Sequence, residues 1–153
     1  MKLKHLLLPI ITLIIVACGP KPTNDGFVKS IDAYTSKIEG ATDMKTTLTK
    51  GALTDVSGFN DIGTFSYQEK FSQDEHVLFQ ITNVEKTDQT VTENYYFKAD
   101  ELVLITSKSD SGSTRKLYIK NGRVLARVNI GKAQEELLID KAKLFRKQFK
   151  SAH

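Results

Sequence analysis

The stretch Tyr96-Phe-Lys-Ala-Asp-Glu-Leu-Val-Leu104 recurs 22 residues further along the chain as Tyr118-Ile-Lys-Asn-Gly-Arg-Val-Leu-Ala126. The two copies align without a gap. The second contains the strongest short hairpin signal, because Asn121 and Gly122 both accept the positive φ of a type I′ turn. Ala99-Asp100 is a weaker version of the same turn. Two copies with few glycines do not make a repeat array, so the repeat predicts two adjacent hairpins of one antiparallel meander.

The residues before the repeat continue the strand pattern with less regularity. Apolar and polar residues alternate over 65–71 and 77–82, and this period of two predicts strands. Turn residues occupy 72–75 and 85–89. The signal over 42–63 is poor: Thr46-Thr-Leu-Thr49 predicts a short edge strand, and the glycines at 51, 58 and 63 predict a loop.

Two helices are predicted to flank the strands. The first is indicated by an apolar stripe at helical spacing, formed by Phe27, Ile31, Tyr34 and Ile38. Asp25 suits its N-cap and Gly40 its end. The second is predicted over 132–150, with an apolar face formed by Ala133, Leu137, Leu138, Ala142, Leu144, Phe145 and Phe149. We therefore expect an α+β fold: an N-terminal helix, an antiparallel β-meander of about six strands, and a C-terminal helix packed on one face of the sheet.

The N-terminus has the parts of a secretory signal peptide. A basic start is followed by an apolar run over 6–17, which is too short to span a bilayer because a spanning helix needs about 20 apolar residues. The sequence Ile15-Val-Ala-Cys18 resembles the lipobox of bacterial lipoproteins. In that family a lipid is attached to the cysteine sulfur and the chain is cut just before it. The alternative, an ordinary signal peptide, would leave an unpaired thiol in an oxidising compartment, which is a poorer account of this cysteine.

The lipobox resemblance implies a domain organisation and a location. Residues 1–17 would be the removed signal peptide, 18–26 a lipid-anchored tether with two prolines, and 27–150 a single α+β domain. The location would be the cell envelope. Gly19, rather than Asp, follows the cysteine, so the anchor would lie in the outer membrane, facing the periplasm, if the host has two membranes.

The order of elements carries a second resemblance. A helix, a meander with paired Tyr-Tyr-Phe and Tyr-x-x-Asn-Gly hairpins, and a terminal helix resemble small bacterial lipoproteins of uncharacterised function. The resemblance covers 27–149. Its motifs are structural, so it implies no catalytic residues.

Composition argues against several classes of function. The net charge of +4 falls to +2 once Lys2 and Lys4 leave with the signal peptide, too balanced to indicate a nucleic-acid partner. Beyond the signal peptide the only histidines are His76 and His153, which are distant in sequence. A histidine base for a nucleophile, or a set of three or four zinc ligands, is therefore not indicated. The segment 55–61 lacks the spacing and the closing glutamate of a calcium loop. We therefore expect no enzyme, metal or cofactor, and no small-molecule ligand is implied.

Hairpin register predicts which side chains share a face. With two-residue turns, Phe97 pairs with Leu102 and Tyr95 with Leu104 in the first hairpin. In the second hairpin, Ile119 pairs with Val124 and Leu117 with Ala126. This face is apolar and is expected to be core under one or both helices.

The opposite face is too apolar for an ordinary solvent face of an antiparallel sheet. It carries Tyr96, Val103, Ile105, Tyr118 and Leu125, set among Lys98, Lys116, Lys120, Arg123 and Arg127. Two alternatives remain open. Either part of the chain covers this face, such as 42–63, or Tyr96, Tyr118, Lys98, Lys120 and Arg123 form an aromatic and basic binding face.

These observations predict a lipid-anchored, non-catalytic cell-envelope protein with a small binding or assembly domain. Its partners would be the membrane, through a lipid on Cys18, and an envelope protein. The alternative is an inhibitor of an envelope-attacking enzyme such as a lysozyme, acting through the loop 51–63 with Asp55, Asn60 and Asp61. The terminal helix has a basic patch of Lys143, Arg146, Lys147 and Lys150, which is either a solvated face or a contact with anionic lipid headgroups.

The anchor is testable by metabolic labelling. We expect labelled palmitate to be incorporated into the wild-type protein and not into the Cys18→Ala variant, because the sulfur is the attachment atom. The anchor hypothesis fails if the wild type takes up no lipid while the variant still partitions with membranes.

Overall fold

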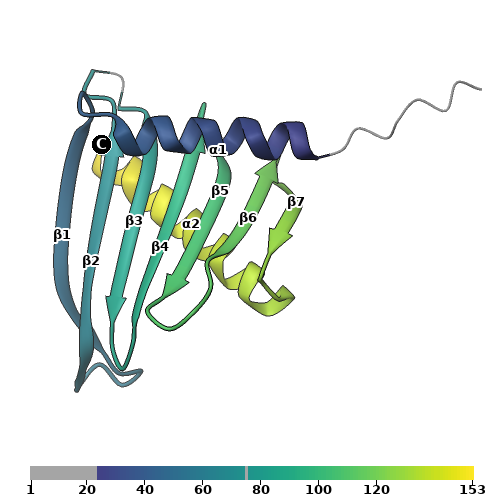
Figure 1. Cartoon of the computed structure of the whole chain (residues 1–153). Helices are drawn as coiled ribbons and strands as arrows, with labels where there is room; N and C mark the ends of the chain where they lie inside the picture. Colours follow the sequence, from purple (N-terminus) through teal and green to yellow (C-terminus); the bar gives the residue numbers. More distant parts are fainter. Residues whose placement is uncertain (1–23, 75) are drawn as a thin grey trace, which may run out of the picture.

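A seven-stranded antiparallel sheet lies between two helices in the computed structural model, which describes residues 24–74 and 76–153 (Figure 1). The strands follow one another across the sheet in chain order. The elements are α1 (Asp25–Gly40), β1 (Lys45–Thr54), β2 (Asp61–Phe71), β3 (Leu78–Lys86), β4 (Thr90–Lys98), β5 (Glu101–Ser109), β6 (Arg115–Lys120), β7 (Arg123–Val128) and α2 (Lys132–Ala152). The expected α+β class is confirmed. The predicted signal peptide, Cys18 and most of the predicted tether lie outside the described residues.

The first strands are longer than the sequence predicts. Instead of a four-residue edge strand followed by a loop, β1 pairs with β2 through Thr54, and only 55–60 connects them. Gly51 does not end the strand, because the ring of Phe65 on β2 occupies the space that a side chain at Gly51 would fill. The prediction of about six strands was therefore one short.

Both copies of the repeat form hairpins, and both contain the same irregularity. Phe97 pairs with Leu102 and Ile119 with Val124, as predicted. One step further from each turn the register shifts by one residue, so that Tyr96 pairs with Leu104 and Tyr118 with Ala126. The predicted partners of Tyr95 and Leu117 are therefore wrong.

The cause of the shift is a β-bulge at the equivalent place in each copy. Val103 in the first hairpin and Leu125 in the second are the extra residues. Beyond the bulge the faces exchange, so Leu104 packs with Tyr96 and Ile105 packs in the core on the other side of the sheet. The sequence-based assignment of Ile105 to the face of Tyr96 is wrong for this reason.

The two hairpin turns share their backbone conformation. Asn121 and Gly122 have φ of 51° and 71°, and Ala99 and Asp100 have φ of 49° and 63°. Ala99-Asp100 is less favourable for this turn than Asn-Gly, but α2 stabilises it. The carboxylate of Asp100 accepts hydrogen bonds from Arg146 Nε at 3.0 Å and from Lys150 Nζ at 2.6 Å, both on α2. A tertiary contact thus supports the turn with the weaker local signal.

One face of the sheet packs against α2. Its core is formed by Phe71, Leu78, Ile81, Tyr95, Phe97, Ile105, Leu117 and Ile119 of the strands with Leu138, Ala142 and Phe149 of α2. The apolar face of α2 is narrower than predicted, because the side chains of Leu137 and Leu144 are 59% and 52% exposed.

A polar cluster joins α2 to the same face. Lys141 Nζ lies 2.8 Å from Glu93 Oε2 and 2.9 Å from Glu85 Oε1, and the Tyr95 hydroxyl donates to Glu93 at 2.8 Å. Burial alone would lower the pKa of Lys141, but its hydrogen bonds to Glu93 and Glu85 raise that pKa above the ordinary value. The cluster therefore holds α2 in place as a satisfied ion-pair network.

The other face of the sheet carries α1, which crosses the strands at the end of the sheet where the β4–β5 and β6–β7 turns lie (Figure 1). We call this the upper end. Ile31 packs there with Tyr96, Val103, Leu104 and Tyr118, and Phe27, Val28, Tyr34 and Ala126 surround this cluster. Lys70 on β2 donates to the carbonyls of Ile38, Glu39 and Ala41, which satisfies the C-terminus of the helix.

The turn at Gly122 provides a test of the register. Gly122→Val should destabilise the protein, because a β-branched residue resists the positive φ of 71°. We expect a loss of about 1 kcal/mol or more, measured as a lower midpoint of thermal unfolding. Gly122→Asn is the matched control and should remain close to wild type, since Asn tolerates this conformation. An unchanged midpoint in the Val variant would mean that the turn is misplaced.

Candidate functional site

The part of the sheet that α1 leaves uncovered is polar. Three rows of side chains cross the strands on the side of α1, further from the upper end than the helix. They consist of Leu48, Gln68, Thr82, Asn94, Thr106, Lys116 and Val128; then Lys50, Ser66, Val84, Thr92 and Lys108; then Ala52, Thr64, Lys86 and Thr90. We call these 16 residues the open face. None of them is buried.

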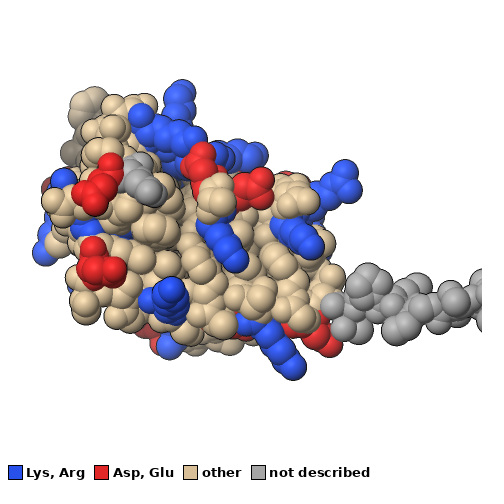
Figure 2. Space-filling view, turned by 90° about the horizontal axis from the view of Figure 1, so that it is seen from above, with Lys and Arg blue, Asp and Glu red and all other residues tan. Residues whose placement is uncertain are grey.

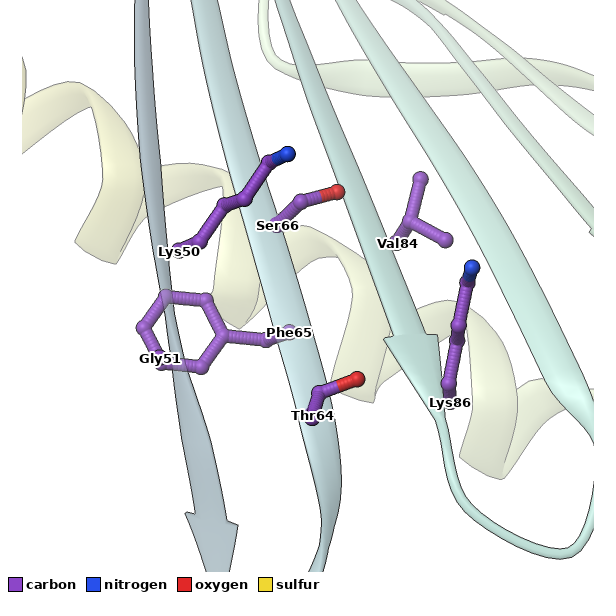
Figure 3. Close-up of a pocket in the computed structure, with 7 residues that line it drawn as sticks. All are labelled: Lys50, Gly51, Thr64, Phe65, Ser66, Val84 and Lys86. Atoms are coloured by element: carbon purple, nitrogen blue, oxygen red, sulfur yellow. The ribbon is translucent and has the colours of Figure 1, made fainter.

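Figure 3 shows the lower left part of the open face, where side chains from three neighbouring strands surround a hollow of about 310 Å³. On the open face, Lys50 comes from β1, Thr64 and Ser66 from β2, and Val84 and Lys86 from β3. The lining is completed by Gly51 and Phe65, whose positions belong to the other face of the sheet. Two further shallow hollows lie on the same side of the sheet, closer to α1. The open face is therefore a shallow, extended surface with no deep pocket.

Charge is segregated between the two faces of the sheet. The open face contains four lysines and no acidic residue. Lys116 pairs with Asp32 of α1 at 3.3 Å, whereas Lys50, Lys86 and Lys108 make no ion pair with any described residue. Three carboxylates of the same strands, at Glu69, Glu85 and Glu93, belong to the face that α2 covers. The other two, Asp61 and Glu101, are the first residues of β2 and β5.

Acidic side chains border the open face on both sides. Asp32 and Glu39 of α1 line the hollows next to the helix. Asp61 of β2 pairs with Thr54, beyond the row of Ala52.

Two further acids lie at the lower rim of the open face. Asp88 is in the β3–β4 turn and Asp110 directly follows β5. The side chain of Asp110 accepts a hydrogen bond from the backbone N–H of Thr90 at 3.1 Å. The open rows themselves are therefore electropositive.

The row next to α1 is ordered by hydrogen bonds between side chains. Thr82 Oγ1 donates to Asn94 Oδ1 at 2.8 Å, Gln80 Nε2 donates to the same oxygen at 3.3 Å, and Asn94 Nδ2 donates to Thr106 Oγ1 at 3.3 Å. These bonds connect three strands. They hold hydroxyl and amide groups at set positions, which lowers the entropy cost of binding a polar ligand.

The two tyrosines of the sequence-predicted binding face are covered. Tyr96 and Tyr118 are only 2% and 3% exposed, and the element above them is α1 rather than 42–63. Their hydroxyls donate to carboxylates of α1, Tyr96 to Glu39 and Tyr118 to Asp32, the latter at 2.8 Å. Burial raises the pKa of both phenols. An open aromatic face is therefore wrong for these two residues, because the helix lies over them.

The three basic residues of that prediction are exposed near the upper end. Lys98 Nζ lies 5.3 Å from the ring centre of Tyr34 and Lys120 Nζ lies 5.5 Å from that of Phe27, so both support α1 by cation–π contacts. Arg123 begins β7. Figure 2 shows that basic and acidic side chains are interspersed at this end of the molecule, which does not carry the single sign of the open face.

The loop that the inhibitor hypothesis depends on is shorter than expected, and its exposed side chains are apolar instead of acidic. It spans 55–60, and its Asp55 carboxylate accepts hydrogen bonds from Ser57 at 2.6 Å, Asn60 at 2.7 Å and the Phe59 N–H at 3.1 Å. These bonds, led by those from Ser57 and Asn60, hold the pKa of Asp55 well below its usual range. Asp55 and Asn60 therefore order the loop, Asp61 begins β2, and the exposed apolar side chains of the loop are Val56 and Phe59.

The remaining candidates are mostly engaged in structural contacts. His153 lies 3.2 Å from Glu69 and packs against the rings of Phe71 and Phe149. His76 is exposed, but the fold brings the centre of its ring to 6.0 Å from that of His153, although the two residues are distant in sequence. On α2, Lys143 pairs with Asp140, and both Arg146 and Lys150 pair with Asp100. Within 24–74 and 76–153 there is no group of three or more metal-ligating side chains. In the same ranges no helix is long and apolar enough to cross a membrane.

Comparison with family models, with curated proteins and with solved structures finds no match for this chain. The open face is thus identified from its own geometry. A signal for it exists in the sequence, since every second residue of 64–70, 80–86 and 90–94, counted from the first, is Ser, Thr, Asn, Gln, Lys or Val and none is acidic. The acids of these segments, Glu69, Glu85 and Glu93, all stand at the other positions.

The covered tyrosines give a second stability test. The double change Tyr96→Ala with Tyr118→Ala should cost several kcal/mol, by comparison with about 3–5 kcal/mol for truncating a buried Phe or Trp. Thermal unfolding measures the loss. The matched control is Val56→Ala with Phe59→Ala in the exposed loop, which should leave the midpoint nearly unchanged. A small drop for the tyrosines would contradict their burial under α1.

Proposed function

We propose that this protein is a lipid-anchored, non-catalytic component of the cell envelope, and that its domain binds a partner or supports an assembly through the open face. The observation that carries the proposal is the open face itself. It is the part of the sheet that α1 leaves uncovered, and three of its lysines have no carboxylate partner among the described residues. A surface of that kind is suited to a ligand of complementary polarity and charge.

The anchor rests on the lipobox resemblance at Cys18. Five residues separate Cys18 from Asn24, so the six steps between their Cα atoms reach about 20 Å in an extended chain. Asn24 donates a hydrogen bond to the carbonyl of Leu125 on β7, so the start of α1 lies beside that strand. A lipid on Cys18 would therefore hold the upper β7 corner near the bilayer, while the open face, with Lys50 and Lys86 toward the lower end of the first strands, stays free for envelope components.

Binding fits the chemistry of the open face better than catalysis. Its hydroxyls, amides and ammonium groups form hydrogen bonds and attract anions, but no His, Cys, Asp or Glu stands at any of the 16 positions. General acid–base catalysis at neutral pH needs a group whose pKa lies near 7. The open face therefore offers recognition without a proton-transfer group.

Inhibition of an envelope-attacking enzyme such as a lysozyme is the second candidate. It is favoured by the loop 55–60, which Asp55 orders and which exposes 88% of Phe59. An inhibitor needs a rigid projecting segment with a side chain able to enter a cleft. In this alternative Phe59 is that side chain, in place of the acids expected from sequence.

Site-specific photocrosslinking in cells tests the proposal with the full chain. A photoreactive residue would replace Ser66 on the open face, Phe59 in the loop, or Lys147 on the exposed side of α2 as the matched control. We expect a specific adduct from position 66, none from position 147, and loss of the adduct when Cys18→Ala is added. An adduct from position 59 alone would support inhibition. Adducts from position 147 and not from 66 would refute a role for the open face.

A further inference from the structure

The uncompensated lysines of the open face are spread along a line. Lys50, Ser66, Val84, Thr92 and Lys108 are paired neighbours on five successive strands. Strands lie about 4.8 Å apart, so the two terminal strands of this row are separated by about 19 Å. Lys86 lies between them in the adjacent row. A single small anion cannot contact charges at this spacing, whereas an extended polyanion can.

The groups between the lysines are hydroxyls and amides. Eight of the 16 residues of the open face are Ser, Thr, Asn or Gln. Ser66 and Thr92 lie in the lysine row itself, and the other six lie in the two rows beside it. Such side chains donate and accept hydrogen bonds at once, which matches the hydroxyl groups of a sugar. Lysine ammonium groups bind carboxylate, sulfate or phosphate as point charges.

The open face is poorly suited to the two other polyanions, an acidic polypeptide and a single-stranded nucleic acid. None of its 16 residues is aromatic. Its apolar residues are Leu48 and Ala52 on the edge strand β1, Val84 on β3, and Val128 on the edge strand β7. Protein interfaces depend on central aromatic or Arg anchors. Single-stranded nucleic acids depend on aromatic side chains for base stacking. The open face can therefore bind a ligand through hydrogen bonds and charge, but not through aromatic contacts from its own residues.

We propose that the open face binds a linear anionic polysaccharide laid across the strands, parallel to α1. The proposal rests on the proposed function and names its ligand class. α1 forms one wall of the site. Its Asp32 is paired with Lys116, whereas Glu39 accepts a hydrogen bond from the neutral Tyr96 hydroxyl and keeps its charge. The polymer is therefore expected to follow the row of Lys50 and Lys108, one row further from α1 than Lys116. Affinity for the polymer should fall steeply with ionic strength, because the three lysines are exposed.

The test uses the full chain in detergent with dextran sulfate as the probe and dextran, which has the same backbone without charge, as its control. Lys50→Gln, Lys86→Gln and Lys108→Gln are combined in one variant. The matched control combines Lys132→Gln, Lys143→Gln and Lys147→Gln, three exposed lysines of α2 on the other side of the sheet, with the same change in net charge. We expect the dissociation constant for dextran sulfate to rise at least about tenfold in the first variant and less than about threefold in the second.

Several outcomes would overturn the inference. Equal losses in both variants would mean unspecific attraction to net charge, and equal binding of dextran would mean that the lysines do not select anions. Tighter binding of poly-glutamate than of dextran sulfate would assign the surface to an acidic polypeptide. Unchanged melting of both variants is required for the comparison, and the Gln substitutions at exposed sites should meet it. If no polysaccharide binds while the crosslink from position 66 persists, the ligand class is wrong and the proposed function stands.

Discussion

A match between two repeat distances positions α1 on the sheet. Seven residues of an α-helix rise about 10.5 Å, and two strand spacings amount to about 9.6 Å. The repeated hairpins are two strands apart, so a helix that crosses the strands meets equivalent positions of both copies once every seven residues. The contacts follow this rule in two sets: Phe27 under Lys120 and Tyr34 under Lys98, then Asp32 with Tyr118 and Glu39 with Tyr96.

The bulges in both hairpins serve the same packing. They exchange the faces of the residues that follow, and they bring Leu104 to the side of Tyr96, under Ile31. Because the bulge recurs at the equivalent position of each copy, the surface offered to the helix recurs as well. The internal repeat is thus a repeat of three-dimensional contacts, although its two copies differ at several residues.

The crossing direction also explains why a polar surface remains. A helix lying across the strands covers the width of the sheet but only about 10–12 Å of its length, whereas β1 and β2 have 10 and 11 residues and extend about 3.3 Å per residue. The rows beyond the helix must face solvent or a ligand. On the opposite side α2 runs diagonally and covers the carboxylates of the strands, with Lys141 among them. The charged residues at the 16 positions of the open face are therefore all lysines.

The sequence by itself determined the elements whose signals are local. Asn121-Gly122 predicted the position of one hairpin, and the internal repeat predicted the position of the other. The apolar stripes at helical spacing in 27–38 and 132–150 predicted both helices. The sequence also left two alternatives for the face that carries Tyr96, which is either covered by part of the chain or open to a partner. The sequence could not predict the one-residue bulge of the first hairpin. Leu102 through Ile105 are all apolar, so these residues are buried in either register. The continuation of β1 past Gly51 was also hidden, since the ring that protects it comes from Phe65 on another strand. Only the tertiary structure decided that α1 covers the tyrosines and leaves the lysines open, because that choice depends on distances between segments far apart in the chain.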